Sequence, residues 1–61
     1  MAIMDDLKIF VLEDIKTEFG FVVYSEPEFA ELCARVYNWA TDSNQFKVLG
    51  RDGEYYLSKT N

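Results

Sequence analysis

The residue types that usually carry catalysis are scarce in this chain of 61 residues, which has no histidine and one cysteine, Cys33. Histidine is the usual general base, and a thiol with no base to activate it behaves as a small buried hydrophobe. Carboxylates stand side by side at Asp5–Asp6 and Glu13–Asp14. Adjacent residues on a strand point to opposite faces, so neither pair can converge on one substrate atom. We therefore expect no catalytic residues and no enzymatic activity.

The sequence also lacks the patterns that hold metals and cofactors. One thiol without histidine does not supply the three or four ligands of a zinc site, and no calcium loop of alternating carboxylates occurs. The glycines at 20, 50 and 53 match neither of the phosphate-binding patterns GxxxxGK and GxGxxG. We expect no cofactor and no metal.

Composition predicts one folded domain, residues 1–61, in which residues 1–6 are expected to be flexible or loosely ordered. The chain is 49% hydrophobic and 16% aromatic, which excludes a disordered tail. The lone cysteine, the absence of a basic signal segment and the absence of roughly 18 consecutive apolar residues favour a cytoplasmic protein. The net charge of −5 repels nucleic-acid phosphates and anionic lipid. The expected partner is a larger protein with a basic surface, with no direct nucleic-acid binding and no membrane contact.

The clearest local pattern is a helix from Pro27 to Thr41. Ser25 is the predicted N-cap, Glu28 closes a capping box, and the proline lies in the first turn. An apolar stripe at helical spacing is predicted to face the core; it consists of Phe29, Leu32, Cys33, Val36 and Ala40.

A β-hairpin is predicted downstream, from Gln45–Leu49 and Glu54–Lys59, around the turn sequence Gly50–Gly53. Whether the loop has two or four residues, the same side chains share each face of the hairpin. One face then carries Phe46, Val48, Tyr55 and Leu57.

Upstream, Lys8–Leu12 and Phe19–Tyr24 are rich in β-branched and aromatic residues and are predicted to be strands. The alternative is a helix from Asp5 to Glu18, which leaves Ile9 on its polar side. With the strands, the fold class is α+β, in the order ββαββ: a four-stranded, mainly antiparallel sheet with one helix packed on one face.

Such a helix covers only one side of the sheet, and the strands do not alternate cleanly between apolar and polar residues. The uncovered side is therefore predicted to bind a partner; it consists of Phe10, Leu12, Val22, Tyr24, Leu49 and Tyr56. The competing explanations are that the chain ends fold back over this side, or that some of these residues belong to the core.

The pattern of the strand pair Lys8–Tyr24, the helix opening Ser25–Phe29 and the strand Phe46–Leu49 resembles that of small phage-encoded takeover proteins. The resemblance covers most of the chain and involves no specific motif. It implies docking on a host enzyme such as RNA polymerase, and it departs from the polymerase inhibitors in the final Tyr55–Tyr56 strand.

The leading hypothesis is a stoichiometric inhibitor or modulator of a larger protein, acting by surface occlusion. Acidic residues would steer it towards a basic site; those residues are Glu26, Glu28, Glu31, Asp52 and Glu54. One alternative is a nucleic-acid mimic that blocks the cleft of a nuclease, restriction enzyme or CRISPR effector, whose binding would fall steeply with salt. Another is a structural homodimer, which sedimentation would reveal.

Overall fold

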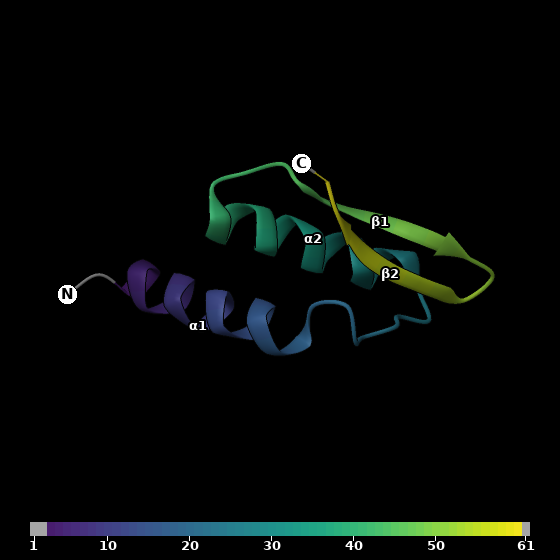
Figure 1. The fold of residues 1–61 in the computed structure, drawn as a ribbon, viewed down its shortest axis with the longest axis horizontal. Helices are drawn as coiled ribbons and strands as arrows, with labels where there is room; N and C mark the ends of the chain where they lie inside the picture. The colour runs from purple at the N-terminus through teal and green to yellow at the C-terminus, as the bar shows by residue number, and fades with distance from the viewer. Residues whose placement is uncertain (1–2, 61) are drawn as a thin grey trace.

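The computed structural model describes residues 3–60, which form two helices followed by a hairpin (Figure 1). The elements are α1 (Ile3–Glu18), α2 (Pro27–Thr41), β1 (Phe46–Arg51) and β2 (Glu54–Lys59). The fold is α+β, but the sheet has two antiparallel strands and not four, and two helices accompany it. The prediction of a ββαββ fold was therefore wrong in its first half.

The error lies in residues 3–18, which form a single helix. Leu7, Val11 and Ile15 recur every fourth residue, and Val11 is buried while Ile9 is exposed, as the alternative reading of this segment required. The helical period outweighed β-propensity, which is a weaker and more context-dependent preference. Gly20, with φ +90°, follows the end of the helix. The likeness to phage takeover proteins accordingly loses the strand that began at Lys8.

Residues 3–6 lie in the first turn of α1, where a flexible or loosely ordered segment was expected. Residues 1 and 2 lie outside the described residues.

Of the predicted strand Phe19–Tyr24, only Tyr24 pairs as a strand residue does. Tyr24 pairs with Tyr55 of β2 through two backbone hydrogen bonds, of 2.7 and 2.9 Å. Residues 19–23 form a turn and a loop. This pairing holds the connection between the two helices against the outer edge of β2.

The prediction of α2 from Pro27 to Thr41 is confirmed at both ends. The N-cap, however, is Glu26 and not Ser25, and no side chain caps the helix, so the predicted capping box is wrong. Proline at the first helical position sets the start, because it has no N–H to leave unpaired. At the other end Asp42 adopts a left-handed conformation and stops the helix.

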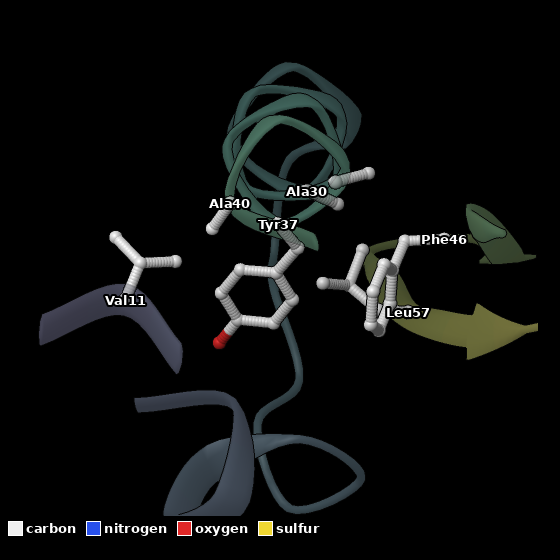
Figure 2. Packing of buried hydrophobic residues seen from close by; sticks show 7 residues of the cluster. Val11, Ala30, Tyr37, Ala40, Phe46 and Leu57 are labelled. Carbon is white, nitrogen blue, oxygen red and sulfur yellow. The ribbon is translucent and has the colours of Figure 1, made fainter. Parts of the chain in front are cut away.

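Helix α2 lies between α1 and the hairpin, and α1 itself does not reach the strands (Figure 1). Figure 2 shows the ring of Tyr37 between Val11 of α1 on one side and the hairpin residues Phe46 and Leu57 on the other. The buried residues of α2 are Ala30, Ala34, Tyr37 and Ala40. Three of the four are alanines, which allow the neighbouring elements to approach the helix closely.

The hairpin is confirmed, although β1 begins one residue later and ends two residues later than predicted. Arg51 pairs with Glu54, so the turn is Asp52–Gly53, and both turn residues have positive φ angles, as a tight two-residue turn requires. Phe46 and Leu57 are buried, and Val48 and Tyr55 are partly buried on the same face, which confirms the predicted parity.

Candidate protein-binding groove

The six residues predicted to form one binding surface are distributed over three parts of the molecule. Phe10 and Leu12 are exposed on α1, and Val22 and Tyr24 are partly buried in the loop between the helices. Leu49 and Tyr56 are directly paired across the hairpin, and both are exposed. The single outer sheet surface does not exist, because the sheet that would carry it has only two strands.

The residues predicted to steer a partner are all exposed, at two places. Glu26, Glu28 and Glu31 lie at the start of α2, and Asp52 and Glu54 lie at the hairpin turn. The two places are at the same end of the molecule, because Gly53 of the turn lies beside the Ser25 carbonyl, just before α2.

Helix α2 has two apolar faces, and the one with the larger side chains is exposed. Its buried face consists mainly of alanines, and Ala30 has no accessible surface. Phe29, Leu32 and Val36, which were predicted to face the core, are 58%, 54% and 36% exposed. The correction has a geometric reason: α2 is packed between two elements, and the narrow alanine face fits that space better. The helix therefore presents its largest apolar side chains to the outside.

The exposed face of α2 forms one wall of a groove that α1 completes. The groove has a volume of about 330 Å³, and we call it the helical groove. It is lined by Phe10, Val11, Asp14, Tyr24, Phe29, Leu32, Cys33, Val36 and Tyr37. The Phe10 side chain is 71% exposed at its edge, and Leu7 lies one turn earlier on α1. The sequence predicts two of these residues, Phe10 and Tyr24, as partner contacts.

Two hydrogen bonds place polar atoms within this apolar lining. The Tyr37 hydroxyl donates to Oδ2 of Asp14 at 3.0 Å, and the Tyr24 hydroxyl donates to Sγ of Cys33 at 3.1 Å. The first bond joins α2 to α1 across the groove, and the second joins the loop between the helices to α2. Burial raises the pKa of both phenols above the ordinary tyrosine value; the thiol of Cys33 and the carboxylate of Asp14 raise it further.

These raised pKa values predict a loss of stability in alkali. In the unfolded chain both phenols ionise near pH 10, whereas in the folded chain they hold their protons to higher pH. The free energy of unfolding should therefore keep the full contribution of these phenols below about pH 10 and lose it progressively above that pH. Urea midpoints measured between about pH 8 and 12 would show the fall. Tyr24→Phe and Tyr37→Phe should each make the fall shallower, and an unchanged slope in both would contradict the assignment.

At the other end of the helix pair, Lys8 connects α1 to the last turn of α2. Its Nζ lies 3.3 Å from a carboxylate oxygen of Asp42 and 5.4 Å from the centroid of the Trp39 ring. The ion pair is exposed at the aspartate, so it contributes little to stability. The contact joins the first half of α1 to the C-terminal end of α2, as the antiparallel arrangement of the two helices requires.

Charge is distributed unequally between the helices and the hairpin. Helix α1 has five acidic residues and two lysines, a net charge of −3, and α2 has two glutamates and one arginine, a net charge of −1. Residues 46–59 have three basic and two acidic residues, a net charge of +1. The helical groove therefore lies between the two acidic elements of the chain.

Sequence reasoning missed this groove because it assigned the largest apolar stripe of α2 to the core. A usable signal was present: Ala30 and Ala34 are four residues apart, with Tyr37 next on the same side of the helix. Small residues at helical spacing are compatible with a helix packed between two other elements. The apolar side chains Phe29, Leu32 and Val36 could then have been assigned to the surface.

Comparison of the chain with family models, curated proteins and solved structures finds no match. Among residues 3–60, no helix is long and apolar enough to cross a bilayer. Within the same range, no three His, Cys, Asp or Glu side chains lie together in a way that could hold a metal ion.

Proposed function

We propose that this chain is a small acidic protein-binding domain that inhibits or modulates a larger protein stoichiometrically, by covering part of its surface. The observation that carries the proposal is the helical groove, with its exposed large apolar side chains beside a buried alanine face. A chain that functioned alone would gain more free energy by burying Phe29 and Leu32 than by burying alanines, because burial free energy grows with apolar area. A partner that covers the groove supplies that missing burial.

The accessible area is consistent with an incompletely covered molecule. The chain exposes 4658 Å², whereas a compact monomer of 7.1 kDa exposes about 4,100 Å². The excess is about 560 Å², smaller than the roughly 800 Å² that each partner buries in a standard interface. Part of the exposed surface is apolar, because Phe10, Phe29 and Leu32 are each more than half exposed, and neighbouring exposed apolar side chains are typical of an interaction site.

The hairpin offers a smaller apolar surface. Leu49 and Tyr56 are 47% and 45% exposed and are paired across the two strands. They have no third large apolar neighbour on that face of the sheet, since the remaining residues there are Lys47, Arg51, Glu54 and Ser58. The groove is therefore the preferred surface, and the hairpin provides the natural control.

The test compares two exposed phenylalanines. Phe10 lies at the edge of the groove, and Phe21, 83% exposed, lies outside it. Each is changed to serine; both variants should unfold within about 0.5 kcal/mol of the wild type, because exposed substitutions cost little. Immobilised wild-type protein and each variant are then used to capture partners, which mass spectrometry identifies. We expect a partner that wild type and Phe21→Ser retain and that Phe10→Ser loses.

A Tyr56→Ser variant completes the set. Loss of the partner through this variant, with retention by Phe10→Ser, would refute the groove as the binding surface. A complex that dissociates steeply with rising salt would instead favour the nucleic-acid mimic, because apolar contacts respond weakly to ionic strength. A stable dimer in sedimentation, with no captured partner, would favour the structural homodimer.

A further inference from the structure

We infer that the helical groove binds an amphipathic helix of another protein, and that a lysine or arginine of that helix pairs with Asp14. The inference rests on the proposed function and names the class of partner. It follows from the secondary structure of the groove walls, from their charge and from the position of one carboxylate.

The groove walls favour a helix over an extended strand. An added strand gains its affinity from main-chain hydrogen bonds to a sheet edge. Here the walls are the side chains of α1 and α2, whose main-chain groups are bonded within each helix, and of Tyr24, whose main-chain groups are bonded to Tyr55. A helix satisfies its own main chain and presents apolar side chains three and four residues apart. Phe29, Leu32 and Val36 follow the same spacing and would lie against such a stripe.

The charge around the groove favours a basic partner. Asp6 and Glu13 are exposed on α1, four residues before and three residues after Phe10, so both flank it on the helix surface. The Glu13 carboxylate lies 3.7 Å from Lys16, but both side chains of this pair are mostly exposed, so the contact is weak. A helix with lysine or arginine beside its apolar stripe would bring opposite charges to this rim. A second copy of the chain would bring its own acidic helices, and each copy has a net charge of −5. Charge therefore disfavours self-association through this surface.

Asp14 is placed to receive a cation. It lines the groove beside Phe10, it is only partly exposed, and its Oδ2 accepts the Tyr37 hydroxyl. A carboxylate accepts several hydrogen bonds, so the contact with Tyr37 leaves capacity for a charged donor. An ion pair is stronger where water is partly excluded, as it would be beneath a docked helix. Tyr37 also fixes the carboxylate in position before the partner arrives.

The experiment uses two synthetic helical peptides with an identical leucine stripe, one flanked by lysines and the other by glutamates. Each is titrated into the labelled 61-residue protein, and nuclear magnetic resonance shifts and calorimetry report where and how tightly it binds. We expect the lysine peptide to shift the signals of Phe10, Phe29, Leu32 and Val36, and the glutamate peptide to leave them unchanged.

The decisive variant is Asp14→Asn, because the amide oxygen can still accept the Tyr37 hydroxyl while the charge is lost. We expect the affinity for the lysine peptide to fall about tenfold, which corresponds to about 1.4 kcal/mol. The matched control is Asp52→Asn at the hairpin turn, which removes the same charge and keeps a residue that tolerates the positive φ of 55° there. It should bind as the wild type does. Replacing the peptide lysine that faces Asp14 with norleucine should abolish the difference between wild type and Asp14→Asn.

Three results would overturn the inference: equal binding of both peptides, equal weakening by Asp14→Asn and Asp52→Asn, or a dimer that Phe10→Ser dissociates. These results are distinguishable from failure of the proposed function. If neither peptide binds but a captured protein still requires Phe10, the inference is wrong and the proposed function stands. If Phe10→Ser captures the same protein as the wild type, the groove is not the binding surface and the inference is wrong; if the wild type captures no protein, the proposed function is wrong.

Discussion

Phe46→Ala is expected to unfold a large fraction of the molecules at room temperature. The Phe46 ring makes edge-to-face contacts with Phe19 and with Tyr37, at centroid distances of 5.4 and 5.3 Å, and is 3% exposed. Truncating a buried phenylalanine costs about 3–5 kcal/mol. A domain of this length has only about 3–9 kcal/mol of stability in total, so the loss approaches the whole. Urea unfolding followed by circular dichroism would measure it.

Two controls separate the loss of this contact from a general effect of the substitution. Phe46→Leu retains most of the apolar volume and should cost less than half as much. Phe21→Ala removes a phenylalanine that is 83% exposed and should change the free energy of unfolding by less than about 0.5 kcal/mol. A Phe46→Ala variant as stable as Phe21→Ala would show that the hairpin does not pack on α2 as described.

Gly50→Ala should be the most costly glycine substitution in the chain, at about 2–4 kcal/mol. Gly50 has φ +109°, a conformation that residues with a Cβ rarely adopt, and an added Cβ would collide with the carbonyl oxygen of Glu54. That carbonyl belongs to the backbone of the paired strand and cannot move without disturbing the hairpin.

Gly20→Ala provides the comparison for this prediction. Gly20 also has a positive φ, +90°, but an added Cβ would meet nothing within 4 Å. Only the backbone strain remains, about 1–2 kcal/mol. Both variants would be compared by their urea midpoints at one pH. Equal costs would mean that the strand relaxes around Gly50.

The structure confirms the sequence predictions where particular residues restrict the backbone and the packing of the elements agrees with that restriction. Proline at the start of α2 and Asp52–Gly53 at the turn restrict the backbone directly, so the bounds of α2 and the parity of the hairpin could be predicted. The segment Lys8–Leu12 has no such residue, and its β-branched side chains suit either a strand or a buried helix. The connection to the next predicted strand, Glu13–Glu18, contains no Gly or Asn that would suit a turn. That absence was better evidence for a helix than the β-branched residues were for a strand.

The spacing of Ala30 and Ala34 indicates which side of α2 is closely packed, but the groove itself also depends on where α1 lies, which the sequence of α2 does not specify. Phe29 and Ala30 are neighbours in the sequence, and the amphipathic pattern of the helix by itself predicts that the phenylalanine faces the core. The hairpin and α1 both pack on α2, and their positions determine which of the two is covered. Only Phe10 and Tyr24 were identified in advance, and they were identified through a sheet that is not there.

The side chain of Asn38 has a consequence for how the molecule behaves at high concentration. Its amide donates to the Phe46 carbonyl at 3.1 Å and accepts from the Phe46 N–H at 2.9 Å, as a neighbouring strand would. Tyr24 does the same for Tyr55 at the opposite margin of the hairpin. Each margin is thus partly occupied by the chain itself, which hinders the stacking of hairpins from different molecules into aggregates. The hairpin therefore offers few free main-chain groups to another hairpin, although large apolar side chains are exposed elsewhere on the molecule.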